Sequence, residues 1–329
     1  MKKTLLFLAL SLFFVTALPA QKIASADLRQ LRLKEDSLRK LSENLTLDSL
    51  TAGRMRSDSL FVRTLVRSLQ YKNSFYYPFD SVLGVSHLYA PDSTFRIFTW
   101  LMNFDGIYSR QRGAIQMRTP DGSLRLFPLR DVSEFTENAL DSVRTKDNWI
   151  GAVYYNIIKN SWNGKPVYTL FGLDDNNVRS KKKWIETLTF DERGPLFGAV
   201  SFTFEKDSVK RAPQRRFFIE YKKEATTLVN FIDEQNMILV DHLVSESDEP
   251  ELAYTLVPDG DSEAFKWERG QWVHIDKAFT YKVDMTGADP YLGRPPVGDP
   301  ILDAKGVKNE EKLKVKSEEN KTKVKKKGD

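Results

Sequence analysis

Five apolar and aromatic segments between Trp149 and Tyr221 constrain the fold of this chain more than any other feature. In VYTLF (167–171) and VSFTF (200–204), alternate residues form two distinct sets, as the two faces of a β-strand require. Turn residues such as Asn163-Gly164 separate the segments. The stretch therefore predicts a meander of antiparallel strands at the centre of the core.

Further strand patterns lie on both sides of this stretch, and turn signals recur about every ten residues. This spacing is typical of all-β architectures. We therefore expect a mainly β fold, with the antiparallel meander forming a sandwich, a barrel or a strongly bent sheet. The β-rich domain is expected over 72–283, and residues 132–146 are expected to include a short helix between strands.

The segment 21–71 has the pattern of amphipathic helices rather than strands. Leu31, Leu38 and Leu45 are spaced seven residues apart, which favours a helical extension with coiled-coil character. Asp-Ser-Leu recurs at irregular intervals, and Asp and Ser are common helix caps, so two or three short helices are the simpler interpretation. The alternative is a stalk that forms a homo-oligomer or binds a partner through 21–71.

The first twenty residues have the build of a signal peptide. Lys2 and Lys3 precede the apolar run Leu5–Val15, and Ala20 offers a cleavage site before Gln21. The run is short for a membrane span, which needs roughly 20 apolar residues. The sequence contains no cysteine, which excludes disulfides, a thiol nucleophile, a zinc–thiolate site and a lipid-modified N-terminal cysteine. We expect an exported protein, periplasmic or associated with the outer membrane and soluble after cleavage.

The net charge of +5 is concentrated at the C-terminus. Residues 305–329 hold 10 Lys against 4 Glu and 1 Asp, whereas 21–304 sum to −2. The basic character therefore belongs to the tail, which is predicted to be disordered, and not to a binding face of the fold. Before it, 284–304 is expected to be an extended segment rich in Pro and Gly. No nucleic-acid partner is expected. The lysines of the tail that would contact an anionic surface are Lys321, Lys323, Lys325, Lys326 and Lys327.

Asp241 and His242 are the only catalytic candidates that the sequence offers. A carboxylate can orient an imidazole for acid–base chemistry, but adjacent residues of a strand point to opposite faces. The sequence has neither a Gly-x-Ser-x-Gly elbow nor a His-Glu-x-x-His motif. The exposed Asp beside a structural His is therefore the favoured interpretation, and no cofactor is expected.

Two acidic segments, 174–177 and 258–263, carry the oxygen ligands that calcium prefers. Neither matches the EF-hand spacing, and Asp, Asn and Gly are ordinary turn residues, so turns are favoured and no metal site is expected. Trp162 and Trp267 lie beside turns, which makes them the candidates for exposed aromatic residues that stack on a glycan. Core filling is nevertheless the favoured interpretation, because β cores bury large aromatic residues.

Several segments resemble a family of exported proteins of unknown function from Bacteroidetes-type Gram-negative bacteria. The segments are YYNIIKN (154–160), VYTLFGLDDN (167–176), the block 182–202, RRFFIEYKKEA (215–225), DHLV (241–244) and PDGDSEAF (258–265). The resemblance implies an envelope location and transfers no catalytic residue. The expected function is a non-catalytic binding or assembly component whose partner is an envelope protein or glycan. The alternative is an envelope hydrolase acting on a glycan or lipid.

Overall fold

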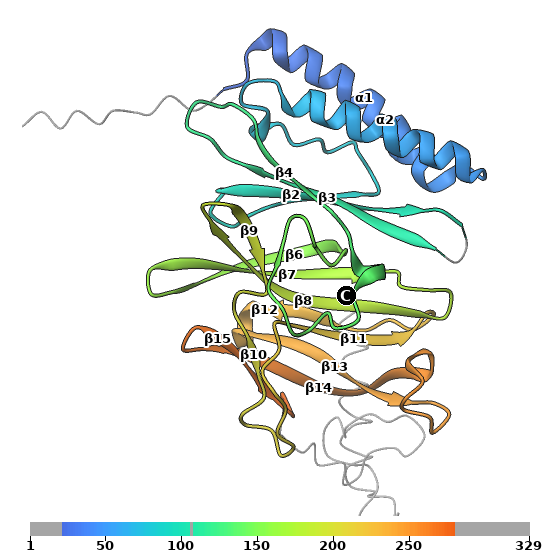
Figure 1. The fold of residues 1–329 in the computed structure, drawn as a ribbon, viewed down its shortest axis with the longest axis vertical. Helices are drawn as coiled ribbons and strands as arrows, with labels where there is room; N and C mark the ends of the chain where they lie inside the picture. Colours follow the sequence, from blue (N-terminus) through green and yellow to red (C-terminus); the bar gives the residue numbers. More distant parts are fainter. Residues whose placement is uncertain (1–21, 106–107, 280–329) are drawn as a thin grey trace, which may run out of the picture. The chain divides into compact units, whose positions relative to one another are not determined.

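Residues 22–105 and 108–279 are described by a computed structural model, and they form four stacked layers (Figure 1). A helical hairpin covers a first sheet, which packs on a central sheet, which packs on a last sheet. The predicted signal peptide 1–20, the segment 284–304 and the tail with its five lysines lie outside the described residues. No helix of the described part is long and apolar enough to cross a membrane.

The helical hairpin consists of α1 (Ser25–Leu47) and α2 (Thr51–Leu69). The helices predicted for 21–71 are therefore confirmed, but they are not a free extension. Leu31, Leu38 and Leu45, the predicted coiled-coil seam, are buried in a cluster with aromatic residues of the first sheet. The seven-residue spacing thus produces an apolar helix face that packs on a sheet of the same chain and not on the helix of a second chain.

The first sheet is a four-stranded antiparallel meander in the order β1-β2-β3-β4. One of its faces contacts the helices and the other contacts the central sheet, so β2 is buried over most of its length. Its strands are β1 (Val85–Tyr89), β2 (Phe95–Asn103), β3 (Ser109–Met117) and β4 (Arg125–Leu129).

The central sheet contains six strands and includes the stretch that dominates the sequence. Tyr168 and Leu170 contribute to the cluster with the first sheet, while Phe171 contributes to the cluster with the last sheet. Both faces are therefore core, and the predicted antiparallel meander at the centre of the core is confirmed, except that the strand within VSFTF (200–204) joins the last sheet. Its strands are β5 (Arg144–Thr145), β6 (Val153–Trp162), β7 (Lys165–Asp174), β8 (Ser180–Asp191), β9 (Gly194–Phe197) and β11 (Arg216–Lys222).

The last sheet has five strands in the order β10-β15-β14-β13-β12. Four of them form a second meander, and β10 joins its edge in parallel with β15. The strands are β10 (Phe202–Thr203), β12 (Val229–Ile232), β13 (Met237–Ser245), β14 (Leu256–Glu268) and β15 (Gln271–Ile275).

Two local expectations are wrong. Residues 132–146 contain only a 3-10 turn at Ser133–Phe135 and the short strand β5, because the backbone N–H of Val132 bonds to Trp149 and β5 pairs with β9. The acidic segment 258–263 is not a turn between strands but the middle of β14, where the register shifts opposite Asp241 and Leu243. A β-bulge absorbs the extra residues, and Gly260 has a φ of +95° there.

Candidate functional site

The structure separates the two residues that the sequence offered as a catalytic pair. Oδ2 of Asp241 accepts a hydrogen bond from the backbone N–H of Leu228, at 2.6 Å. The imidazole Nδ1 of His242 lies 2.9 Å from Oδ2 of Asp259, across the bulge in β14. Asp241 and His242 thus have different partners, as the alternation along β13 requires. The His242–Asp259 pair is partly exposed at the surface.

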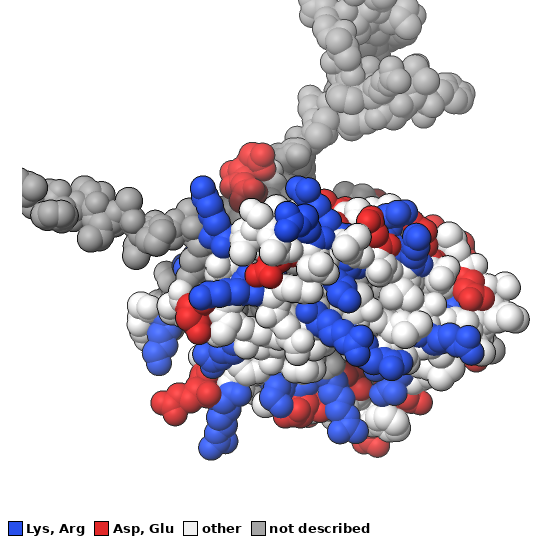
Figure 2. Space-filling view, turned by 90° about the horizontal axis from the view of Figure 1, so that it is seen from above, with Lys and Arg blue, Asp and Glu red and all other residues white. Residues whose placement is uncertain are grey.

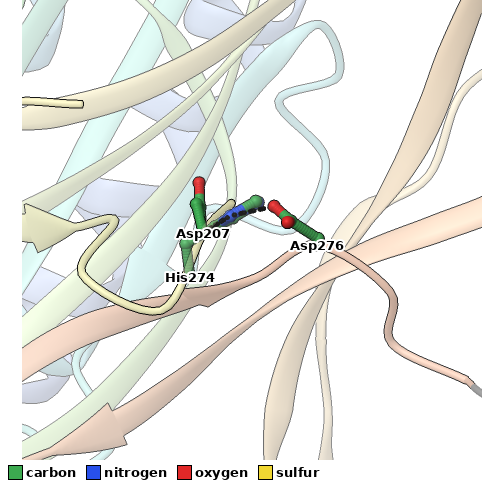
Figure 3. A group of neighbouring side chains, drawn as sticks. All are labelled: Asp207, His274 and Asp276. Carbon is green, nitrogen blue, oxygen red and sulfur yellow. Dashed lines mark hydrogen bonds and ion pairs between the residues drawn. The ribbon is translucent and has the colours of Figure 1, made fainter. Parts of the chain in front are cut away.

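A second histidine, which no local pattern marks as a catalytic candidate, has the more elaborate surroundings. His274 of β15 is fully buried, with Nδ1 lying 2.8 Å from Oδ1 of Asp207 and Nε2 lying 2.9 Å from Oε2 of Glu263. Oδ1 of Asp276 lies 3.5 Å from Nδ1. Figure 3 shows both aspartates next to the imidazole. We call His274, Asp207, Asp276 and Glu263 the His274 cluster.

Three elements position this cluster. Asp207 follows β10, Glu263 belongs to β14 and His274 belongs to β15. The imidazole packs among the rings of Phe204, Phe217 and Phe265, with its centroid 4.9 Å from that of Phe265. These rings keep water from one side of the imidazole, so the carboxylates act on it at short range and in a medium of lowered dielectric constant.

The electrostatics of the cluster follow from these contacts. Burial disfavours the charged imidazole, but the bonds to Glu263 and Asp207 outweigh burial and raise the pKa of His274. For Asp207, burial favours the neutral acid, but Arg211 and His274 more than compensate and lower its pKa. The Nη2 atom of Arg211 lies 2.7 Å from Oδ2 of Asp207, the oxygen that does not face the imidazole.

The cluster has the histidine–carboxylate contacts that a hydrolase would need, but it is not arranged as an acid–base site. A general base requires a nitrogen that can reach the substrate or the attacking water. Both nitrogens of His274 already contact carboxylates, and only 1 % of its side chain is exposed. The geometry therefore favours a fixed, buried group over one that exchanges protons with a substrate.

The two tryptophans that were candidates for glycan stacking lie near one another at one end of the central and last sheets. Trp162, at the end of β6, is 45 % exposed, and its ring packs against Gly270, where a Cβ atom would lie 2.5 Å from the ring. Trp267 stands opposite Trp272 in the ladder of β14 and β15, with ring centroids 5.2 Å apart. Trp267 is only partly exposed, as core filling predicts, because this contact turns it towards the core between the sheets.

The acidic turn 174–177 already holds a cation from the chain itself. The ammonium of Lys223 donates to the carbonyl oxygens of Asp175 and Asn177, at 2.8 and 2.9 Å. It also lies 2.7 Å from Oδ1 of Asp175. The oxygens that would bind calcium are thus satisfied by a lysine, and the turn interpretation describes this loop.

The outer face of the helical layer is strongly basic, a property that the near-neutral sum over the body concealed. Residues 22–72 carry a net charge of +5, and the remaining described residues, 73–105 and 108–279, carry −5. Among the exposed side chains of 22–72, eight are basic and two are acidic. Figure 2 looks onto this layer and shows Lys and Arg spread across it. The basic residues are Lys22, Arg29, Arg32, Lys40, Arg56, Arg63, Arg67 and Lys72, and the acidic ones are Asp36 and Glu43.

The basic character is most regular on α2. Arg56, Arg63 and Arg67, which we call the arginine stripe, recur with helical spacing on the exposed face, with Leu60 between them. None of the three arginines forms an ion pair within the described part of the chain. The expectation that the basic character belongs only to the tail is therefore wrong: a basic layer covers one end of the fold.

A shallow cleft of about 320 Å³ opens beside the stripe, between the two helices and the turn that follows α2. It is lined by Lys34 of α1 and by Arg67, Gln70 and Tyr71. Two cations, an amide and a phenol present hydrogen-bond donors to this space. The cleft therefore suits an anionic group such as a carboxylate.

Comparisons with known proteins provide no identification: no family model, no curated protein and no solved structure matches this chain.

Proposed function

We propose that this protein is an exported cell-envelope component that acts by binding rather than by catalysis, and that the outer face of its helical layer is the binding face. The observation that carries the proposal is the arginine stripe with its neighbouring cleft. Export is supported by the signal-peptide pattern of residues 1–20. The partner that fits best is another envelope protein with an acidic surface.

Unpaired arginines on a rigid helix are suited to this role. The stripe presents three guanidinium groups at fixed spacing, and their long-range attraction speeds the encounter with an acidic partner. Arginine also binds carboxylates through two parallel hydrogen bonds and is enriched in the energetic centres of interfaces. The helix is held in place by the buried leucines beneath it, so little order has to be gained on binding.

Exposed apolar side chains accompany the charges. Leu33 and Leu60 on the two helices are 60 % and 41 % exposed, and Met55 is 47 % exposed. Such side chains supply the apolar contacts of an interface, and the surrounding cations supply its polar rim. Asp36 and Glu43 interrupt the basic face on α1, which favours a protein that can pair each charge over a uniformly anionic lipid surface.

Site-specific photocross-linking in intact cells tests the proposal. A photoreactive residue in place of Leu60, between Arg56 and Arg63, is expected to form an adduct with one defined envelope protein. Val209, which is 76 % exposed near the last sheet, is the matched control position and is expected to form none. The variant Arg56→Glu/Arg63→Glu/Arg67→Glu is expected to abolish the adduct, because reversal of three charges turns attraction into repulsion.

The control for charge reversal is Lys165→Glu/Arg193→Glu/Lys266→Glu, which changes the same number of exposed basic residues outside the helical layer. It is expected to leave the adduct intact. Deleting 22–72 is uninformative by comparison, because it would expose the apolar cluster under the helices. An adduct with lipid alone, or an adduct that survives reversal of the arginine stripe, would contradict the proposed partner. Hydrolysis of a glycan or lipid that depends on Asp241 or His242 would support the hydrolase alternative instead.

A further inference from the structure

We infer that the His274 cluster is a binding site for one divalent transition-metal ion, held by Nδ1 of His274, Oδ1 of Asp207 and a carboxylate oxygen of Asp276. This inference is independent of the proposed binding face, which lies in the outermost layer at the other end of the fold (Figure 1). Zinc is the probe that fits the ligand set best, because imidazole nitrogen and carboxylate oxygen are both common zinc ligands.

The separations between ligand atoms fit a single metal centre once Asp207 moves slightly away from the imidazole. Two ligands that each lie about 2.1 Å from a tetrahedral metal are about 3.4 Å apart. Nδ1 of His274 is 3.5 Å from Oδ1 of Asp276, which agrees with this value. It is 2.8 Å from Oδ1 of Asp207, a hydrogen-bond distance, so these two atoms have to separate by about 0.6 Å when a metal enters. All three ligand atoms lie within 4.8 Å of one another. Figure 3 shows an aspartate on either side of the imidazole edge, with contacts from both to the ring, so one ion between them would contact all three residues.

The surroundings of these ligands also have the form of a metal site. The second imidazole nitrogen, Nε2, lies 2.9 Å from Oε2 of Glu263. A carboxylate in this position fixes the ring and the tautomer, so that the lone pair of Nδ1 faces the other two ligands. Arg211 contacts Oδ2 of Asp207, which leaves Oδ1 for the metal. The same Nη2 atom lies 3.4 Å from Nδ1, so the partly exposed Arg211 side chain has to turn away from the ring when a metal enters.

The charge balance favours a cation. Asp207, Glu263 and Asp276 bring three carboxylates to the cluster, and Arg211 is the only permanently charged base that contacts it within the described residues. A divalent ion would neutralise the excess and release the proton from Nδ1 to water. It would also join the loop after β10 to the end of β15, and thereby clamp the edge of the last sheet.

Zinc titration of the purified protein, without a histidine tag and after chelator treatment, tests the inference. We expect one zinc ion per chain by calorimetry. The melting temperature is expected to rise by roughly 5 °C at a hundredfold excess over the dissociation constant. Cobalt bound at the same site is expected to give visible absorption bands, a signal that a purely structural ion-pair cluster cannot produce.

Asp276→Asn is the decisive variant, because the Asp276 side chain is 50 % exposed and its replacement should leave the fold intact. It is expected to weaken zinc binding at least tenfold and to leave the metal-free melting temperature unchanged. Glu263→Gln is expected to weaken binding by about tenfold through the orientation of the ring. The matched control is His242→Asn, which removes the other histidine bonded to a carboxylate and is expected to change nothing. Absence of zinc binding, or binding that persists in Asp276→Asn and disappears in His242→Asn, would overturn the inference.

Discussion

Within the part of the chain that the structure describes, two arginines are completely buried, and they are neutralised in different ways. Arg216, in the central sheet, lies 3.1 Å from Oε2 of Glu186, which is also buried. Arg96, in the first sheet, has no carboxylate partner within the described residues. Its guanidinium bonds to Gln116 and Tyr89 and lies over four aromatic rings, the closest being Phe98 at 4.7 Å.

The two arginines nevertheless do the same structural work. Arg96 donates to the carbonyl oxygens of Ser74 and Tyr77, and Arg216 donates to those of Ala139 and Ser142. Each guanidinium thus ties an irregular segment to a sheet by satisfying carbonyl groups that have no strand partner. Five donors in a planar fork make arginine suited to this task.

The two sites differ in what stabilises the buried positive charge of the guanidinium. Burial lowers the pKa of Arg96 to about 10, which reflects a cation stabilised only by dipoles and ring faces. Arg216 instead belongs to a chain of contacts in which Tyr154 donates to Glu186 and Trp149 donates to Tyr154. Burial and the neighbouring Glu186 raise the pKa of Tyr154 well above its usual value, so its proton stays in place. A buried arginine thus needs hydrogen-bond acceptors for its N–H groups at both sites. It needs a carboxylate partner only where other buried polar groups also bond to that carboxylate.

Removing the countercharge should have the largest effect. In Glu186→Gln, the guanidinium of Arg216 becomes a buried charge without a partner, and Tyr154 loses its charged acceptor. We expect the free energy of unfolding to fall by about 3–5 kcal/mol. Denaturant unfolding measures the change. The control Glu268→Gln breaks the exposed pair with Lys206 and should leave the midpoint almost unchanged. Similar losses in both variants would show that the pair in the central sheet is not strongly coupled.

The sequence predicted the strands and helices that carry these charged residues, but not which charged residues contact one another. Alternation in the central stretch indicated an antiparallel meander at the core, and helical periodicity indicated the N-terminal helices. These features depend on local patterns, which each strand or helix carries in its own residues. The separation of Asp241 from His242 could be predicted for the same reason, since it follows from the geometry of one strand.

What could not be predicted depends on residues far apart in the chain. Glu186 interrupts the apolar run of β8 and Arg216 begins the next long strand, but only the pairing of β8 with β11 places them opposite one another. His274 and Asp207 are separated by 67 positions, and nothing local marks them as neighbours. The pattern of 258–263 predicts an acidic turn, whereas Glu263 lies in β14 beyond the bulge, two residues before Phe265, which stands opposite His274. The near-neutral sum over 21–304 did not indicate the basic helical layer for a related reason, because a sum along the chain does not show where in space the charges lie.

Replacing Arg96 should have a smaller effect than removing Glu186. In Arg96→Met, the flexible side chain keeps much of the packing against the aromatic rings, and no opposite charge is left unpaired. The carbonyl oxygen of Tyr77 loses the donor from Arg96, and that of Ser74 keeps only the backbone N–H of Tyr77, so we expect a loss of about 2–3 kcal/mol. The same denaturant measurement applies. The variant Gln116→Glu tests the same comparison more sharply, because it places a carboxylate beside Arg96, as Glu186 lies beside Arg216. A stability change as large as that of Glu186→Gln in Arg96→Met would remove the distinction between the two sites.

The smallest loss of stability is expected at an ion pair whose side chains are partly exposed to solvent. Asp92, beside β2, lies 2.9 Å from Nζ of Lys159 in the central sheet, and also accepts hydrogen bonds from Thr94 and Tyr168. Partial burial favours the neutral acid, but these contacts dominate and hold the pKa of Asp92 well below its usual range. We expect Asp92→Asn to cost about 1–2 kcal/mol at neutral pH, less than the shift in pKa alone would give, because solvent partly screens the pair.

The pH dependence of this loss separates the charge from the side chain's shape. The folded-state pKa of Asp92 is lower than the unfolded value of about 3.9, so the ionised group stabilises the fold above that pH. The contribution disappears as the pH falls through the folded-state pKa. The difference in unfolding free energy between the wild type and Asp92→Asn should therefore be constant from pH 8 to about pH 5 and shrink below about pH 4. A difference that is unchanged in acid would mean that Asp92 acts through neutral hydrogen bonds, as the partners of Arg96 do, and not through its charge.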